Sequence, residues 1–408
     1  MSQWILHPLL AVAVYALALL CASLLLRCMP AIARSLDSNG SARFASIDGL
    51  RGYLALGVFI HHAVITWFYL DSGQLAVPPS NFYAQIGVTS VALFFMITGF
   101  LFWHRLLEQG DRHDWLAFAV SRVFRLYPLY LPLLAVVLIS VFWMQDWRLH
   151  ESPWAVLKQV LLWLSFDRPD INAYPHTGML IANVTWTLSY EVFFYLALPL
   201  LSLVFLKRGP WPQVLLCLAG IYLLYQLIGW NHSLKKHYLA SFLGGIAAAY
   251  WVRRPALVDW GRSRLAGALA LLALLVVMTA FRKSFALVPL LLLGLFFAIV
   301  ASGNRLFGAL QPRALRWLGE ISYSTYLLHG FVLWLVVQRL PLLLPFDIRP
   351  PLPYLALLAG ATCLLVLLSS LTFLYLEKPG MAAGKRLIGW LRRRQPSPTA
   401  VDENLRHP

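Results

Sequence analysis

Three titratable side chains lie inside long apolar stretches of this sequence: His62, Glu191 and His329. If these stretches cross a membrane, each ionisable group costs on the order of 3 kcal/mol, so each needs a partner or a chemical task. A histidine suits general-base or nucleophilic catalysis, because its unperturbed pKa lies near neutrality. A buried carboxylate can be a general acid or base, can orient a histidine, or can make only a structural hydrogen bond.

Arg51 and His62 are predicted to share one face of a helix. They are eleven residues apart in one apolar stretch, and at 100° per residue this spacing lies within about 20° of three full turns. We expect the two side chains roughly 16 Å apart along the helix. Neighbouring His61 is expected to point away and to be structural. The alternative is that Arg51 is an ordinary basic flank and His62 a hydrogen-bonded core histidine.

Arg122 and Arg125 are three residues apart at the start of another apolar stretch. This spacing makes them neighbours on one helical surface. Two adjacent guanidinium groups suit a phosphorylated ligand. The alternative is an interfacial anchor beside Tyr127.

Polar side chains accompany the other two titratable groups at helical spacing. Thr187 and Tyr195 lie one turn on either side of Glu191, and Ser322 and Thr325 lead up to His329 at steps of three and four residues. From the ends of their apolar stretches, we expect Glu191 at a depth of about 12 Å and His329 at roughly 14 Å. His62, Glu191 and His329 are therefore candidates to meet at a similar depth.

The elements that must position these groups are predicted to be membrane-spanning helices. Hydrophobic residues make up 60% of the chain and charged residues only 12%, far from the averages of soluble proteins. Crossing about 30 Å of hydrocarbon takes roughly 17 to 25 apolar residues. We therefore predict an all-α bundle of about eleven spans, near residues 5–26, 49–70, 88–106, 121–144, 183–206, 213–230, 237–251, 265–281, 285–301, 320–339 and 353–376. The run at 154–166 is too short and is predicted to be interfacial or re-entrant.

The distribution of basic residues predicts the orientation of these spans. Most of the 33 Lys and Arg residues fall on one side when the N-terminus is placed outside and the C-terminus in the cytoplasm, as the positive-inside rule requires. Lys235–Lys236 and Arg282–Lys283 are contrary signals, so a mispaired central span is an alternative. The first span lacks a basic flank before it and has Arg27 after it, which disfavours a cleaved signal peptide.

Charge and motifs also exclude several function classes. The net charge of +16 comes from short basic clusters between apolar runs, which fits membrane orientation rather than nucleic-acid binding. The four cysteines lack the spacing of a metal site, and we expect no metal. The sequence contains no GxxxxGK[ST], GxSxG or HExxH motif. Any chemistry is expected from buried His and Glu.

Six segments together carry a resemblance to a known family. In order along the chain they are Asp48-Gly-Leu-Arg51 with His62, Phe94 to Leu101, Arg122 to Arg125 with Tyr127-Pro128, Trp186 to Glu191, Leu318 to His329, and Glu377-Lys-Pro379. Over about residues 44–380 the chain resembles membrane acyltransferase family 3, the bacterial O-acyltransferases of surface glycans. The resemblance implies a ten-helix core that moves an acyl group, commonly acetyl, from cytoplasmic acyl-CoA to a hydroxyl. Departures from the family pattern are Thr98 in place of Ser, an additional first span, and no extracellular hydrolase-like domain after the core.

The resemblance implies roles for particular residues. His62 is the expected catalytic histidine, as general base or transient acyl carrier, oriented by Glu191 or another buried group. Arg51, Arg122 and Arg125 are expected to engage the donor, with Arg51 also essential for catalysis. Supporting or substrate-lining positions are expected at Asp48, Thr98, Trp186, Ser189, Tyr195, Ser322 and His329.

The resulting prediction is a multi-pass O-acyltransferase of the bacterial inner membrane. Its expected partners are acyl-CoA as a donor substrate, a glycan or lipid-linked glycan acceptor and membrane lipids, with no bound cofactor and no nucleic acid. We divide the chain into an extra helix with a cytoplasmic linker (1–43), the acyltransferase core (44–380) and a basic, disordered cytoplasmic tail (381–408). A transporter or flippase of a lipid-linked or acylated substrate is the main alternative, and a non-catalytic scaffold is another.

Overall fold

The regular secondary structure in the described residues is helical, apart from an isolated β-bridge between Ile171 and Tyr174. The computed structural model describes residues 4–38, 44–73, 76–206, 210–232, 234–343, 347 and 350–394. The first eight helices are α1 (Leu9–Cys28), α2 (Pro30–Ser38), α3 (Ala45–Ser72), α4 (Asn81–Gln109), α5 (Trp115–Met144), α6 (Pro153–Leu164), α7 (Trp186–Phe205) and α8 (Trp211–His232). The next eight are α9 (Lys236–Trp251), α10 (Pro255–Gly261), α11 (Arg264–Ala280), α12 (Leu287–Ala301), α13 (Arg313–Glu320), α14 (Ser322–Leu333), α15 (Pro351–Thr372) and α16 (Lys378–Arg394).

The protein is a multi-pass membrane protein. Within the described residues, eight helices are long and apolar enough to cross a membrane, and a ninth is added if α10 and α11, bent by 73° at their junction, form one span. Each of the eleven predicted stretches overlaps a helix. The 16 residues of α9 and the 15 residues of α12 fall short of a full crossing, because a helix rises only 1.5 Å per residue.

The two short helices pack inside the protein. α9 packs against both α4 and α12, and 83% of the most apolar window of α4 is buried. Gly99 of α4 and Gly245 of α9 lie where the two backbones approach closely, so that a Cβ atom at either position would overlap the backbone of the other helix. Small residues at such crossings let membrane helices pack tightly. Close packing against α4 therefore holds α9 within the bundle.

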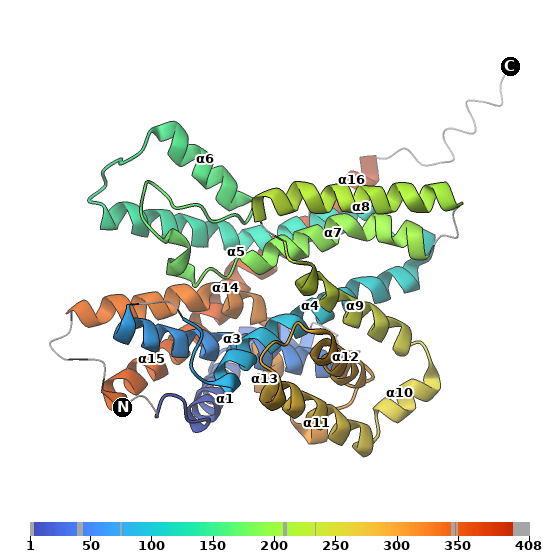
Figure 1. Cartoon of the computed structure of the whole chain (residues 1–408), viewed down its shortest axis with the longest axis horizontal. Helices are drawn as coiled ribbons and strands as arrows, with labels where there is room; N and C mark the ends of the chain where they lie inside the picture. The colour runs from blue at the N-terminus through green and yellow to red at the C-terminus, as the bar shows by residue number, and fades with distance from the viewer. Residues whose placement is uncertain are drawn as a thin grey trace.

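The candidate site residues lie on helices that cross near the centre of the bundle. α3, which carries Arg51 and His62, packs against α4, α13 and α14. Figure 1 shows α6 with its long connections at one end of the molecule and α10 at the opposite end. The predicted short run at 154–166 is the 12-residue α6, which is too short to cross a membrane.

The two ends of the chain lie on the flanks of this core. α1 packs against α13 and α15. The tail, residues 381–408, is predicted from the sequence to be disordered. Residues 381–394 are instead helical and continue α16. Residues 395–408 lie outside the described residues. Gly380 and Gly384 let α16 approach α5 closely at Pro128 and Phe124, and this packing orders the basic segment.

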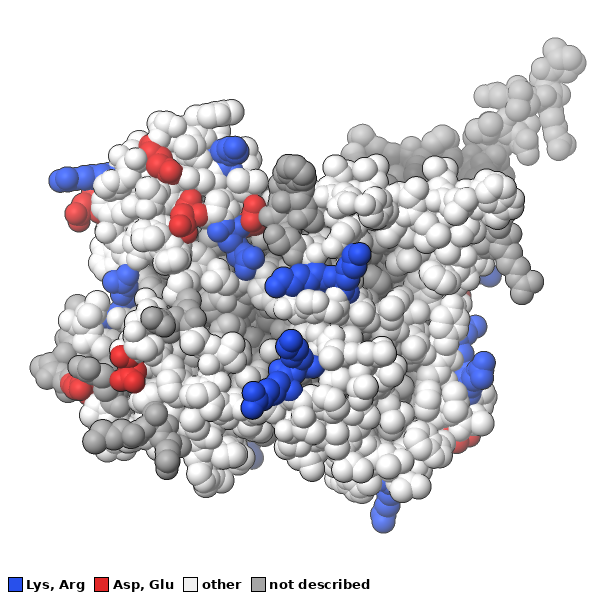
Figure 2. Space-filling model, in the orientation of Figure 1, with Lys and Arg blue, Asp and Glu red and all other residues white. Residues whose placement is uncertain are grey.

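Charged side chains are sparse on the face shown in Figure 2. The acidic residues gather mainly at one end of that face, around α6, and two groups of basic residues lie near its middle, over the start of α9 and between α11 and α12. The residues that disagree with the predicted orientation come from these two segments of the chain. Lys235 precedes α9, and Arg282 lies between α11 and α12.

Candidate active site

A cavity of about 520 Å³ lies between α3, α4, α5, α7, α14 and α16. Seven of the predicted site residues line it: Arg51, Thr98, Arg122, Arg125, Glu191, Tyr195 and Ser322. They come from five helices, so the fold collects side chains that are far apart in sequence. The remaining predicted residues, Asp48, His62, Trp186, Ser189 and His329, do not line this cavity.

Glu191 is held by two hydroxyl groups in the cavity wall. The Tyr195 hydroxyl, one turn further along α7, donates to Glu191 Oε2 at 2.6 Å. The Thr98 hydroxyl of α4 donates to Oε1 at 3.4 Å. The side chain at position 98 is therefore a hydrogen-bond donor to the buried carboxylate, a task that a serine hydroxyl also performs.

Arg122 is enclosed by aromatic rings. Its guanidinium carbon lies 4.7 Å from the centre of the Phe102 ring and 5.9 Å from that of Tyr195. Cation–π contacts of this kind stabilise a desolvated guanidinium by up to about 2 kcal/mol. Because Tyr195 also donates to Glu191, the arginine and the carboxylate are linked through one side chain.

Arg125 forms an ion pair with Glu377, a residue to which the sequence analysis assigned no role. Arg125 Nη1 and Glu377 Oε2 lie 2.8 Å apart, with the Glu377 side chain fully buried. Ser324 of α14 also donates to Glu377. Glu377 ends a π-helical stretch, Phe373–Glu377, between α15 and α16, and such stretches are frequent at functional sites. The sequence signals for Glu377 were its place in Glu377-Lys-Pro379, one of the six segments that carry the resemblance, and its position at the end of the apolar run 353–376.

The lining of the cavity is basic on balance. Arg51, Arg122, Arg125, Lys378 and Lys385 contribute five positive charges, whereas Glu191 and Glu320 are the two acidic residues that line it in the described part of the chain. Arg51 Nη1 lies 3.7 Å from Asp48 Oδ1 on the same helix. The rest of the wall carries the hydroxyl groups of Thr98, Thr187 and Ser322 and is otherwise largely apolar or aromatic, with residues such as Val91, Phe94, Phe95, Ile97, Leu101, Phe102, Leu126, Leu188 and Phe373. The cavity therefore suits an anion with an apolar extension.

His62 and His329 lie side by side next to this cavity. Their ring centres are 5.1 Å apart. Tyr326 connects the pair to the cavity, because it lines the cavity and its ring centre lies 5.9 Å from that of His329. The Tyr326 hydroxyl is anchored by the Val184 carbonyl oxygen at 3.0 Å and by the Thr187 hydroxyl at 2.8 Å.

His329 is fully buried, and one of its two ring nitrogens is available to form a hydrogen bond. Its Nδ1 lies 3.3 Å from the Thr325 carbonyl oxygen, whereas its Nε2 has no hydrogen-bond partner among the described residues. A buried ring nitrogen without a partner loses its hydration and so favours an incoming polar group. The α6–α7 connection covers the adjoining end of α14, since a Cβ atom on Gly330 would overlap the backbone at Ile181.

The other predicted residues have different surroundings from those expected. Glu191 bonds to Tyr195 and Thr98, and neither histidine is among its hydrogen-bond partners in the described part of the chain. Trp186 packs against Tyr190 and Tyr238. His61 Nδ1 lies 2.6 Å from the Tyr83 carbonyl oxygen, in line with the structural role predicted for it. Ser189 is buried on α7.

Comparison with known protein families assigns this chain to one of them. A family model described as an acyltransferase domain matches residues 44–370. The chain belongs to the acyltransferase 3 family. The matched residues include Arg51, His62, Glu191 and His329, so the histidine pair lies within the family's domain. Most of the cavity lining lies there too, while Phe373 and the lining residues of α16 follow the matched segment.

Two curated relatives support the assignment of this chain to the acyltransferase 3 family. The chain is 25% identical over 379 residues to the peptidoglycan O-acetyltransferase OatA of Listeria monocytogenes, covering 82% of this chain and 55% of that protein. It is 30% identical over 185 residues to the acyltransferase MdmB of Streptomyces mycarofaciens, covering 44% of each chain. The chain thus spans about half the length of the curated relatives it matches. No solved structure matches the chain. The chain is therefore a multi-pass membrane protein of the acyltransferase 3 family.

Proposed function

We propose that the protein transfers an acetyl group from cytoplasmic acyl-CoA to a hydroxyl group of a cell-surface glycan. The observation that carries the proposal is the His62–His329 pair, which lies one aromatic ring away from a basic, partly apolar cavity. The cavity would hold the phosphates and the pantetheine arm of the donor, with Arg51, Arg122 and Arg125 as the phosphate contacts. His62 would act on the reacting atoms beyond Tyr326.

The proposed step is ordinary acyl transfer. The acceptor oxygen attacks the thioester carbonyl carbon, the C–O bond forms, and the C–S bond breaks. His62 accepts the hydroxyl proton and returns it to the departing sulfur, so that free CoA leaves as a thiol. In the alternative order, His62 Nε2 or Nδ1 attacks first and carries the acyl group before the hydroxyl takes it. We propose His329 as the neighbour that positions the His62 ring.

Glu191 is proposed to organise the donor side of the site. Its contacts with Tyr195 and Thr98 place a negative charge beside Arg122, which shares Tyr195 with it. We infer that Glu191 orients the guanidinium rather than the catalytic histidine. In this proposal His329, rather than the expected Glu191, orients the His62 ring.

The choice of acetyl and of a glycan acceptor has support from one relative. The Listeria protein is named a peptidoglycan O-acetyltransferase, and its similarity to this chain covers 82% of the chain. We also propose a bacterial inner-membrane location, with the N-terminus outside, the C-terminus in the cytoplasm, residues 1–43 as an addition to the core and 44–380 as the catalytic unit.

Release of free CoA by the purified protein tests this proposal. With acetyl-CoA and a peptidoglycan fragment as substrates, we expect acceptor-dependent release of CoA and an acetylated product detected by mass spectrometry. His62→Gln should lower kcat by about 100-fold or more, because a positioned general base contributes about 10²- to 10⁴-fold. The comparison variant is His61→Gln. The His61 ring centre lies 5.2 Å from that of His62, but its Nδ1 is engaged by the Tyr83 carbonyl oxygen, so we expect a loss of turnover far smaller than that of His62→Gln.

Two results would contradict the proposal. Full turnover by folded His62→Gln would remove the assigned catalytic residue. Acceptor movement across proteoliposomes without any CoA release would instead favour the transporter class.

A further inference from the structure

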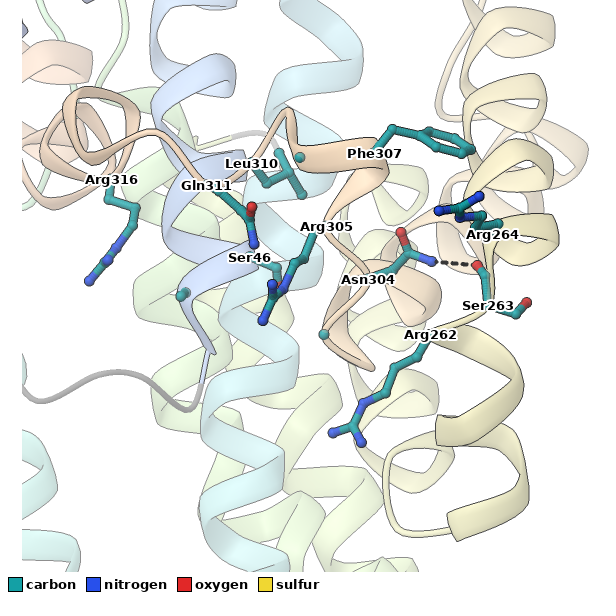
Figure 3. A pocket seen from close by; sticks show the side chains of 14 residues that line it. Ser46, Arg262, Ser263, Arg264, Asn304, Arg305, Phe307, Leu310, Gln311 and Arg316 are labelled. Carbon is teal, nitrogen blue, oxygen red and sulfur yellow. Dashed lines mark hydrogen bonds between the residues drawn. The ribbon is translucent and has the colours of Figure 1, made fainter.

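A second cavity, of about 1220 Å³, lies apart from the histidine pair. It is bordered by the start of α3, the α10–α11 junction, the start of α11, the α12–α13 connection and α13. Four arginines line it: Arg262, Arg264, Arg305 and Arg316. We call it the arginine cavity. Figure 3 shows the side chains of Arg262, Arg305 and Arg316 extending toward the same side of this space.

The charge of the arginine cavity is uncompensated by its lining. No aspartate or glutamate among the described residues lines it, and residues 262–267 and 303–316 contain five arginines and no acidic residue. Positive-inside placement accounts for basic residues near this face of a membrane. It does not account for their convergence on one hollow, because like charges repel and ordinary flanking arginines spread into solvent.

Specific contacts hold two of these guanidinium groups in place. Arg262 Nε donates to the Ser302 carbonyl oxygen at 3.0 Å. The amide oxygen of Gln311, once oriented toward Arg305, accepts from its Nη1 at 2.7 Å and its Nε at 2.9 Å. In each case the acceptor is a neutral carbonyl or amide oxygen. It fixes the position of the guanidinium group but does not neutralise the positive charge.

The two loops that carry these arginines are joined to each other. Asn304 Nδ2 donates to the carbonyl oxygens of Gly261 at 2.8 Å and Ser263 at 3.0 Å. This link ties the α12–α13 connection to the α10–α11 junction, as Figure 3 shows for Ser263. Leu306 and Phe307 have φ values of 44° and 57°, a conformation that costs of order 1–3 kcal/mol for each non-glycine residue and is frequent at ligand sites.

Arg316 adds an independent sign of a missing ligand. Its Nε is buried, and it has no hydrogen-bond partner among the described residues. A buried donor of a charged group without a partner costs about 1–3 kcal/mol or more. An anion in the cavity would remove that cost.

We propose that the arginine cavity binds the phosphate groups of a ligand. Paired guanidinium forks match phosphate oxygens in charge and in geometry. Two sources have this chemistry, namely a nucleotide bisphosphate and an anionic lipid headgroup. The nucleotide source rests on the proposed function: α3 and α13, which border this cavity, also carry Arg51 and Glu320 of the candidate active-site cavity. One donor molecule would then contact both, with its 3′-phosphate in the arginine cavity and its pyrophosphate at Arg51, Arg122 and Arg125. The lipid source is independent of the proposed function.

Direct binding measurements test the site. The full chain is purified in neutral detergent and titrated with adenosine 3′,5′-bisphosphate, and separately reconstituted into nanodiscs of phosphatidylcholine with or without phosphatidylglycerol. We expect Arg305→Gln and Arg316→Gln each to weaken binding of the nucleotide or of phosphatidylglycerol by about tenfold or more, because a charge-assisted hydrogen bond contributes about 1.5–3 kcal/mol. Arg316→Lys should retain part of the affinity, because it keeps the charge without the fork.

Arg313 provides the matched control on the same helix. Its side chain is 60% exposed, pairs with Asp37 and lies outside the lining of the cavity. Arg313→Gln should leave affinity within about twofold, because an exposed ion pair contributes little. Size-exclusion chromatography checks that each variant is folded.

The outcomes separate this site from the proposed function. Loss of nucleotide binding on Arg305 or Arg316 substitution identifies the nucleotide as the ligand, and loss of phosphatidylglycerol binding alone identifies the lipid; either supports the site. Affinities for both probes that are unchanged in the folded Gln variants overturn it, even if His62-dependent CoA release is intact. Conversely, lipid binding that depends on Arg305 would stand if CoA release were never observed.

Discussion

At the scale of single residues, the charged groups of the active-site cavity differ in how firmly they are held. Glu377 is fully buried and receives hydrogen bonds from both Arg125 and Ser324, whereas Asp48 and Arg51 remain partly exposed and lie 3.7 Å apart. At this distance, and with both side chains partly exposed, Arg51 is held less firmly than Arg125, whose nitrogen lies 2.8 Å from a buried carboxylate oxygen. Arg125 is fixed in place by the protein before any donor arrives.

Replacing Glu377 by Gln should destabilise the protein measurably. The substitution keeps the shape but leaves Arg125, whose side chain is 17% exposed, without its counter-charge. Breaking a buried pair costs about 3–5 kcal/mol, and we expect about 2–3 kcal/mol here because water reaches Arg125. The midpoint of thermal unfolding in detergent, followed by intrinsic fluorescence, should fall by several degrees.

The exposed pair between Arg392 and Asp114 is the comparison for this prediction. Its atoms are also 2.8 Å apart, but the Arg392 side chain is 62% exposed. Arg392→Gln should therefore shift the unfolding midpoint by no more than the equivalent of about 1 kcal/mol. Equal shifts for the two variants would mean that Glu377 is not the buried anchor described here.

At the scale of elements, the position of α3 depends on its contact with α13. Gly319 of α13 lies against the backbone of Asp48, and a Cβ atom there would overlap the Asp48 carbonyl oxygen. A backbone atom cannot move aside as a flexible side chain can, so α3 and α13 must separate if position 319 gains a side chain. Arg51 would move with α3.

Gly319→Ala should accordingly impair both stability and donor use. Overpacking of this kind costs about 1–3 kcal/mol, and the displacement of Arg51 should raise the KM for acyl-CoA more than it lowers kcat. Unfolding midpoints and steady-state kinetics measure the two effects. The control is Gly360→Ala on α15, where nothing lies within 4 Å of the added Cβ and helix propensity predicts a neutral or slightly stabilising change. A KM that stays unchanged in Gly319→Ala would separate the α3–α13 contact from donor binding.

At the scale of the whole molecule, the two ends of the bundle differ in charge. The end around α6 carries most of the acidic side chains visible in Figure 2, and the arginine cavity lies toward the opposite end, beside α10. This difference agrees in direction with the positive-inside rule. It supports the orientation proposed above, in which acyl-CoA reaches the protein from the side of α10.

Cysteine labelling in intact cells tests that orientation. In a variant without Cys21, Cys28, Cys217 and Cys363, a membrane-impermeant maleimide should label His150→Cys from outside, because His150 is exposed three residues before α6 begins. Asp259→Cys, exposed on α10, should be labelled only after permeabilisation. The reverse pattern would invert the proposed topology and remove the cytoplasmic access route for the donor.

Much of the architecture follows from the sequence alone, because apolar run length and flanking charge are local properties. The helices, the membrane class and the family all follow from short segments and their order. The candidate residues themselves also follow from the sequence, because ionisable groups inside apolar runs stand out. Their grouping does not: the sequence placed Glu191 with His62 and His329, whereas Glu191 lines a cavity with Arg51, Arg122 and Arg125.

Only the tertiary structure decided which of these groups are partners. The pairing of His62 with His329, and of Glu191 with Thr98 rather than with a histidine, depends on how α3, α4, α7 and α14 rotate against one another. Arg125 and Glu377 are 252 residues apart, and the arginine cavity is assembled from separate loops. Contacts of this kind are set by packing between helices, and the periodicity of a single helix carries no information about its neighbour.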